Sequence, residues 1–448
     1  MALPKPSQGQ ICCTIDRRQF LHTISGIGAT GTLTSLAHAK PDNQKFPFQV
    51  GASVAEIPTP LDVGLLMSSG RQLWEPFDNI RLPICARTVV IERQTQRLAI
   101  VSLDLLGLAG EAVGGMNRFK QQITKASGSL IQPDTLILAS THTHTSPESA
   151  ALTDLYRTPA FQTWCETLAQ QIARSVREAT ATAQPCRLTT GTHLTSNMVL
   201  NRRIRTTKGI RSVRQQIPPD ERIGPKGPAD EHVRVAAFID RQDKPRAILV
   251  NFAAHPVIEM CIKQLSPDYP GEMCLELQRR HPGAAPLFLQ GACGNLNPPK
   301  VATSAEDAQQ YGRQLADAVD TALKASSPDN GNQLAVHRRS VHLPLREDDS
   351  KQEVKTLETK IAAARIGNAA FVFLPGEPFI ELAIAIRQSS PFPFTAVMGY
   401  SEDYIGYIPT DRAFENGGYE TRPGRWSRLA PGSQAIVCNQ ATQLLESF

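Results

Sequence analysis

Three short stretches, far apart in the chain, contain the residue types of a metal site. The first carries His142 and His144, the second ends at His255, and the third contributes Glu377. Each follows directly on an apolar run of the kind that forms a β-strand. Imidazole nitrogens and carboxylate oxygens bind catalytic zinc, which keeps one coordination position open for water. These stretches therefore predict a zinc site assembled at the ends of strands.

Each of these residues also has an ordinary structural interpretation. His142 and His144 are two positions apart in an extended segment, so both side chains point to the same side. One can bind metal while the other contacts a substrate or supports the first ligand. A lone histidine such as His255 is more often a hydrogen-bonded core residue. Glu377 follows a buried strand, where carboxylates are found when they are paired or metal-bound.

Further along the chain, apolar runs alternate with segments of helical periodicity. The runs that predict strands are 98–103, 135–139, 247–252, 286–290, 369–374 and 394–398, and the predicted helices are 161–176 and 306–324. This alternation predicts an α/β fold with a mixed or largely parallel central sheet flanked by helices. In such folds, sites gather at the carboxyl ends of strands. The basic segment 202–228 contains proline and glycine and is predicted to be a loop.

The start of the chain has the pattern of an export signal. Asp16-Arg17-Arg18-Gln19-Phe20-Leu21 fits the twin-arginine motif, a weakly apolar stretch follows, and Ala37-His38-Ala39 fits a cleavage site. We expect residues 1–39 to be a twin-arginine signal peptide and residues 40–448 to form a single catalytic domain. The expected location is therefore the periplasm or the outside of the cell.

The composition argues against two classes of partner. The formal charge of the whole chain is +5, and removal of residues 1–39 leaves +3, which gives no indication of nucleic-acid binding. No later apolar run approaches the roughly 20 residues that a transmembrane helix needs. We therefore expect a small-molecule or lipid-like substrate, no nucleic acid and no transmembrane segment. The oligomeric state cannot be read from the sequence.

Taken in order, these stretches resemble the neutral/alkaline, non-lysosomal ceramidase family. The matching pieces are short but span roughly residues 49–445: 102–104, 140–147, 201–202, 251–255, 266–271, 294–298, 375–377 and 399–407, with 419–420 following. The resemblance implies four zinc ligands, which are His142, His255, Glu377 and Tyr407. Tyr404 is a second tyrosine in the same motif, but the position within the motif selects Tyr407.

The resemblance also implies roles around the metal. His144 and Arg202 match residues that contact the scissile amide or the developing oxyanion, and we expect them to polarise the carbonyl. We expect Asn297 and Asp268 to position substrate or water, although the position of Asp268 in Ser266-Pro267-Asp268-Tyr269-Pro270-Gly271 equally suits a turn former.

Two departures from the family pattern affect the expected substrate. The family has a serine in a Gly-Asp-x-Ser-Pro sequence, whereas Asn297 occupies the corresponding position here. An asparagine has no hydroxyl nucleophile, so an acyl-serine route at this position is excluded. The resemblance also covers only the catalytic domain, without the family's C-terminal β-sandwich. We therefore expect ceramide not to be the substrate.

The sequence favours a zinc-dependent hydrolase that cleaves an amide, or an ester, by attack of zinc-activated water. Two alternatives remain on the same scaffold. One is a metal hydrolase acting on a carbohydrate or cell-wall-derived substrate, since neither ligands nor fold determine the bond cleaved. The other is a non-catalytic periplasmic binding protein.

Overall fold

The computed structural model describes residues 45–448 except 67–73, 213–216, 225, 261 and 347–355. These described residues cluster as one compact unit. The predicted signal peptide, residues 1–39, lies outside the described residues.

The larger of two main sheets is mixed. Its order is β15-β13-β12-β8-β1-β5-β6-β7, with the short β17 paired to β8. Neighbours are parallel at β13–β15 and β6–β7 and antiparallel elsewhere in this order. The strands are β1 (Phe48–Glu56), β5 (Cys85–Arg93), β6 (Gln96–Leu103), β7 (Leu136–Ser140), β8 (Gln184–Leu194), β12 (His232–Asp240), β13 (Pro245–Phe252), β15 (Ala285–Gln290) and β17 (Ser327–Pro328).

A second sheet, which the sequence did not separate from the first, has the order β18-β19-β20-β22. Its strands are β18 (Leu334–Pro344), β19 (Thr356–Ile366), β20 (Ala369–Phe373) and β22 (Phe394–Met398). One buried apolar cluster contains residues of both sheets, among them Phe48, Val89 and Ile100 from the first and Phe371 and Phe373 from the second. The two sheets therefore pack face to face.

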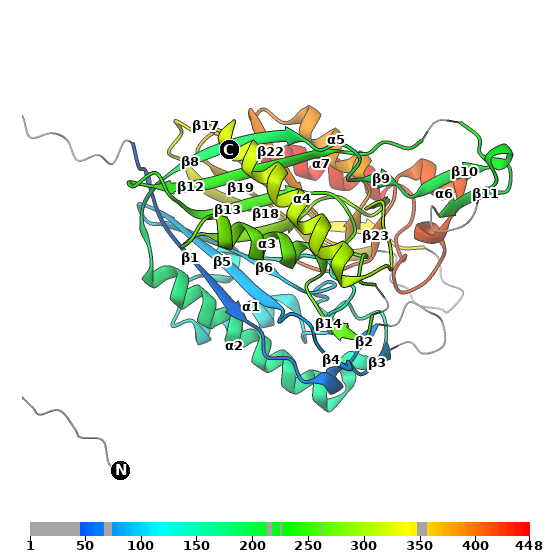
Figure 1. The fold of residues 1–448 in the computed structure, drawn as a ribbon, viewed down its shortest axis with the longest axis horizontal. Helices are drawn as coiled ribbons and strands as arrows, with labels where there is room; N and C mark the ends of the chain where they lie inside the picture. The colour runs from blue at the N-terminus through cyan, green and yellow to red at the C-terminus, as the bar shows by residue number, and fades with distance from the viewer. Residues whose placement is uncertain (1–44, 67–73, 213–216, 225, 261, 347–355) are drawn as a thin grey trace, which may run out of the picture. The chain divides into compact units, whose positions relative to one another are not determined.

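Helices cover the outer faces of both sheets (Figure 1). On the first sheet, α2 packs on β1 and β5, α3 on β15, and α4 on β8 and β12, while α7 packs on β18 and β19 of the second. The helices are α1 (Met116–Ala126), α2 (Pro159–Ala181), α3 (Asp268–Arg280), α4 (Ala305–Lys324), α5 (Ile380–Ser389), α6 (Asp411–Asn416) and α7 (Ser433–Glu446). Local sequence fixes helix starts: the side chains of Thr158 and Ser304 cap α2 and α4.

This architecture confirms the mixed α/β fold. Each of the predicted strands and helices is present, with ends shifted by at most five residues, the largest shift being at the end of α2. Two local expectations were wrong. The segment predicted as a loop contains a hairpin of β10 (Arg203–Thr206) and β11 (Gly209–Ser212), and Asp268 begins a helix instead of standing in a turn. Across the described ranges, no helix is long and apolar enough to cross a membrane.

Candidate metal centre

His142 follows β7 and presents one ring nitrogen to the site. Its backbone has a left-handed φ of 70°, and its N–H donates to the carbonyl of Leu105 at 2.8 Å. The Nδ1 atom lies 2.5 Å from the carbonyl oxygen of Leu106. Because a carbonyl oxygen only accepts, Nδ1 carries the proton and Nε2 keeps its lone pair.

His255, which follows β13, is fixed in the same way. Its Nδ1 lies 2.7 Å from the carbonyl oxygen of Cys293, so Nε2 is again the free nitrogen. Burial, and then the nearby Arg202 guanidinium, lower the pKa of His255 to about 4. The imidazole is therefore neutral near pH 7, which is the form that binds a metal.

Glu377 comes from the short strand β21 (Glu377–Pro378). Its Oε2 lies 3.3 Å from Nε2 of both His142 and His255. The hydroxyl of Tyr404 donates to Oε1 at 2.5 Å, and that of Tyr400 to Oε2 at 3.3 Å.

These atoms have the spacing of metal ligands. The two Nε2 atoms are 3.1 Å apart, and Oε2 of Glu377 lies 3.3 Å from each of them. Three atoms with lone pairs therefore converge on one point. Ligands about 2.0–2.1 Å from a tetrahedral zinc ion lie about 3.3 Å apart, which agrees with these separations. Nε2 of His144 is also buried, with no hydrogen-bond partner in the described part of the chain, and ring nitrogens of all three histidines lie within 4.8 Å of one another. The residues present therefore fit a zinc ion.

Arg202 places a buried cation beside the histidines. Its NH1 lies 3.3 Å from Nε2 of His255 and 3.4 Å from Oδ1 of Asn297. Its other nitrogens donate to Glu420, to the carbonyl of Gly294, and to the hydroxyl of Tyr407 at 2.9 Å. Burial opposes the charge, but Tyr407 and Glu420 outweigh it and raise the pKa of Arg202 well above its usual value.

Tyr407 and Asn297 enter the site from two short strand pairs. Strand β23 (Tyr407–Ile408) pairs in parallel with β21 and places Tyr407 opposite Glu377. Strand β16 (Leu296–Asn297) pairs with β9 (Leu200–Asn201), the segment that precedes Arg202. The structure thus gathers seven of the eight sequence-predicted site residues: His142, His144, Arg202, His255, Asn297, Glu377 and Tyr407.

Asp268 is the eighth, and its contacts lie elsewhere. Its carboxylate accepts the backbone N–H groups of Glu259 at 2.9 Å and of Tyr269 at 2.6 Å. The nearest link to the histidines is Ser266, whose carbonyl accepts the hydroxyls of Thr143 and Thr145 on either side of His144. Asp268 therefore supports the backbone near the site and does not lie among the residues around the metal ligands.

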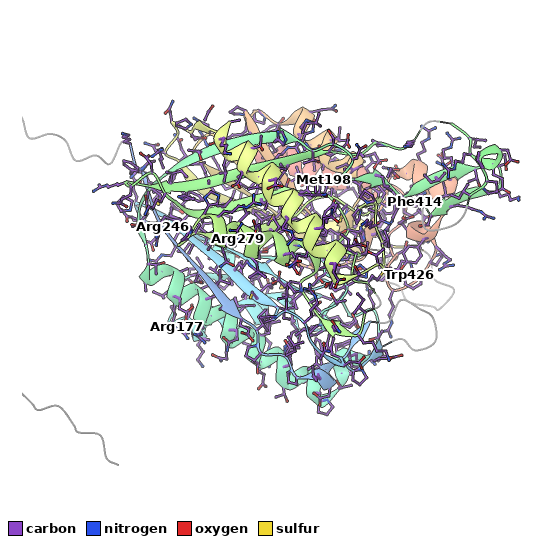
Figure 2. All side chains as sticks on the ribbon, viewed as in Figure 1. Arg177, Met198, Arg246, Arg279, Phe414 and Trp426 are labelled. Atoms are coloured by element: carbon purple, nitrogen blue, oxygen red, sulfur yellow. The ribbon has the colours of Figure 1, made fainter. Side chains whose placement is uncertain are left out.

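The structure also brings in residues that the sequence did not single out. The Tyr400 ring lies 4.1 Å from that of His142, and Glu420 holds the Arg202 guanidinium. Tyr419 is 49% exposed, contacts Tyr407 with ring centroids 5.9 Å apart and stacks on Trp426. Figure 2 shows Trp426 at the same end of the domain as the β10–β11 hairpin. The only sequence signal for these residues was the family-like pieces 399–407 and 419–420, which contain Tyr400, Tyr419 and Glu420; Trp426 lies just beyond them.

Comparisons with known proteins give a fold and no family assignment. No family model and no curated protein matches the chain. A neutral ceramidase from Pseudomonas aeruginosa is similar in structure, with a TM-score of 0.72 and 18% identity over 89% of this chain and 74% of that one. A ceramidase complexed with C2 gives a TM-score of 0.72 and 17% identity at the same coverage. The fold is therefore ceramidase-like.

Proposed function

We propose that this protein is a zinc-dependent hydrolase that cleaves a linear amide bond, or an ester, of a small-molecule or lipid-like substrate. The observation that carries the proposal is the convergence of Nε2 of His142, Nε2 of His255 and Oε2 of Glu377, 3.1–3.3 Å apart and buried. Tyr407 is the proposed fourth ligand. A zinc ion held there supplies Lewis acidity toward water and carbonyl oxygen.

The surrounding side chains provide what hydrolysis of an acyl group requires. Arg202 holds a fixed positive charge beside the cluster, where it can stabilise the negative charge that develops on the acyl oxygen. His144 keeps an unpartnered Nε2 that can accept or return a proton at the leaving group. Asn297 has an amide that can orient substrate, but no hydroxyl that could attack it.

Cys293 does not serve as an alternative nucleophile. Its thiol is fully buried, lies 3.1 Å from the Tyr400 hydroxyl, and has its pKa raised by burial. A thiol held in this form is a poor nucleophile, because the thiolate is the reactive species. The proposal therefore keeps a metal-assisted route. We also propose that the enzyme acts in the periplasm or outside the cell after twin-arginine export.

The test is metal analysis combined with turnover of a substrate panel. His142→Ala and His255→Ala are each expected to remove bound zinc and at least about 100-fold of the activity. His281→Ala is the control. His281 follows the end of α3, is half-buried and is hydrogen-bonded to Asp320 of α4, so it is not one of the proposed ligands. Full zinc occupancy in either of the first two variants would contradict the ligand assignment.

The same panel separates the alternatives. Amides, esters and glycosides are offered to the zinc-loaded protein, and amide or ester turnover supports the proposal. Turnover of glycosides alone would identify a carbohydrate hydrolase. Saturable binding without turnover, with zinc and with other divalent metals, would identify a binding protein on the same fold.

A further inference from the structure

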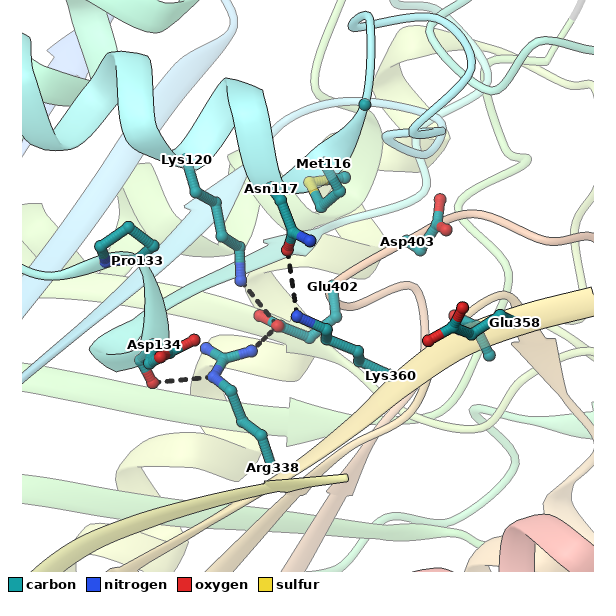
Figure 3. A pocket seen from close by; sticks show the side chains of 12 residues that line it. Met116, Asn117, Lys120, Pro133, Asp134, Arg338, Glu358, Lys360, Glu402 and Asp403 are labelled. Carbon is teal, nitrogen blue, oxygen red and sulfur yellow. Dashed lines mark hydrogen bonds and ion pairs between the residues drawn. The ribbon is translucent and has the colours of Figure 1, made fainter. Parts of the chain in front are cut away.

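A polar cavity of about 270 Å³ lies between α1, β19 and the loop from β22 to β23 (Figure 3). Its volume is just below the roughly 300–1,000 Å³ of typical small-molecule sites, so it suits a small ligand. None of the residues assigned to the metal centre lines it. The cavity is therefore a separate feature of the domain.

Three cationic side chains meet around a single carboxylate in this cavity. Nζ of Lys120 lies 2.6 Å from Oε2 of Glu402, and Arg338 is paired with the same carboxylate. Figure 3 shows the Lys360 ammonium beside them, where it donates to Asn117 at 3.0 Å. Lys120 and Glu402 are both only 4% exposed, so water screens their charges poorly.

The other carboxylates at the cavity do little to balance this charge. Figure 3 shows Asp403, Glu358 and the Asp134 side chain at the margin of the cluster. Asp403 already accepts the backbone N–H of Gly110 at 2.8 Å, and Asp134 and Glu358 are exposed to water. Burial, with Arg338 and Lys360 adding to it, lowers the pKa of Lys120 well below its usual value, although Asp134 and Asp403 partly oppose this. At the centre of the cavity three cationic side chains surround the Glu402 carboxylate, and the other three carboxylates of the lining lie at its margin.

Hydrogen-bond donors are in excess. Lys120 uses two of its three donors, on Glu402 and the carbonyl of Leu136, and Lys360 uses one. A ligand made of acceptor oxygens would satisfy these groups.

We propose that this cavity binds a small anion that carries a phosphate or carboxylate group, held by Lys120, Arg338 and Lys360. The cavity adjoins the proposed metal centre through one segment of the chain. Glu402 lies between Tyr400 and Tyr404, both of which donate to Glu377, and its backbone N–H is bonded to Leu138 at 2.8 Å. An anion in the cavity therefore contacts the segment that holds Glu377 in place.

Calorimetric titration of the zinc-loaded protein tests the site, with inorganic phosphate and succinate as probes and sodium chloride as the ionic-strength control. Saturable binding of one anion per chain is expected. Lys360→Gln is expected to weaken it at least about tenfold, because one charged donor is lost. Arg174→Gln, on the exposed face of α2, is the charge-matched control and should bind as the parent does.

Zinc itself is another place for phosphate, so His255→Ala is titrated as well. The proposal requires binding to persist in that variant and to fall in Lys360→Gln, which separates it from the proposed catalytic function. Response to phosphate alone identifies a phosphate-bearing ligand, and response to succinate extends the class to carboxylates. No saturable binding up to about 10 mM, or equal binding in Lys360→Gln, overturns the site.

Discussion

Single hydrogen bonds determine which nitrogen of each histidine faces the metal site. The carbonyls of Leu106 and Cys293 occupy Nδ1 of His142 and His255, so both Nε2 atoms point at Glu377. Such supporting bonds orient a ligand and raise its basicity, and their loss typically costs about 10–100-fold in metal affinity. Because these partners are backbone atoms, side-chain substitution cannot remove them. Displacement of the loops that carry them can.

The buried carboxyl group of Asp268 predicts how the stability of the protein depends on pH. Burial, and then the charge of Glu259, raise the pKa of this carboxyl to about 7, whereas an unfolded aspartate titrates near 3.9. Between about pH 4 and 7 the unfolded chain releases a proton that the folded chain keeps. Stability therefore falls as the pH rises through this window, by up to about 4 kcal/mol, and levels off above pH 7.

Denaturant unfolding of metal-free protein at pH 5, 6, 7 and 8 measures this slope. Asp268→Asn is expected to flatten it, because the titrating group is gone. It should also lower stability at all four values, because one of the two side-chain oxygens that accept backbone N–H groups is lost. Asp62→Asn, at an exposed position, is the control and should keep the parent slope. An unchanged slope in Asp268→Asn would refute the assigned titration.

At the scale of elements, the short β21–β23 pair joins two of the proposed ligands. Register places Glu377 opposite Tyr407, and the backbone N–H of Glu377 donates to the carbonyl of Gly406 at 2.9 Å. Gly376 makes this approach possible: its φ is 58°, and a Cβ atom there would lie 2.3 Å from the carbonyl oxygen of Gly406. A side chain at this position would push the two strands apart.

Gly376→Ala is therefore expected to lower both stability and zinc affinity. Gly432→Ala is the control, since its backbone is also left-handed, with a φ of 92°, but a Cβ atom there would meet nothing within 4 Å. Both variants bear the cost of a left-handed alanine, about 1–2 kcal/mol, and only Gly376→Ala adds the backbone clash. Unfolding by denaturant and zinc titration measure the difference. Equal losses of stability and zinc affinity in the two variants would show that the contact between β21 and β23 does not contribute to either.

The sequence predicted those strands and helices whose apolar pattern is complete within one continuous segment. Strands 98–103 and 247–252 are buried and apolar at every position except Ser102 and Asn251, and the helix 306–324 has one apolar face, so the local pattern was sufficient. The hairpin of β10 and β11 was missed because basic residues, proline and glycine dominate its segment, although Arg203-Ile204-Arg205-Thr206 does alternate.

Among the site residues, His142, His255 and Glu377 could be named from their type and their place after strands. Tyr400, Tyr419 and Glu420 could not, because their roles depend on contacts between segments that only the folded chain brings together. Glu420, for example, acts through Arg202, which lies 218 positions away in sequence. Asp268 was placed at the site because its segment matched a family motif, and a motif match carries no information on which way a side chain points.

At the scale of the whole molecule, the proposed metal centre joins the two sheets. His142 and His255 follow β7 and β13 of the first sheet, whereas Glu377 and Tyr407 follow β20 and β22 of the second. The separation between the Nε2 atoms and Oε2 of Glu377 therefore depends on how firmly the sheets pack. Their shared apolar cluster is what fixes that packing.

Phe371, at 1% exposure, lies in this cluster, and its ring centroid is 6.1 Å from that of Phe394. Phe371→Ala is expected to cost about 3–5 kcal/mol through lost burial and a cavity, and to weaken zinc binding because the two halves of the site lose their fixed spacing. Phe414→Ala is the control: Phe414 is half-buried in α6 outside the cluster, so its loss should cost less and leave zinc affinity unchanged. Denaturant unfolding and zinc titration of both variants provide the measurement. If Phe371→Ala loses stability but binds zinc as tightly as the parent, the spacing of the ligands is set locally at the strand ends and not by the core between the sheets.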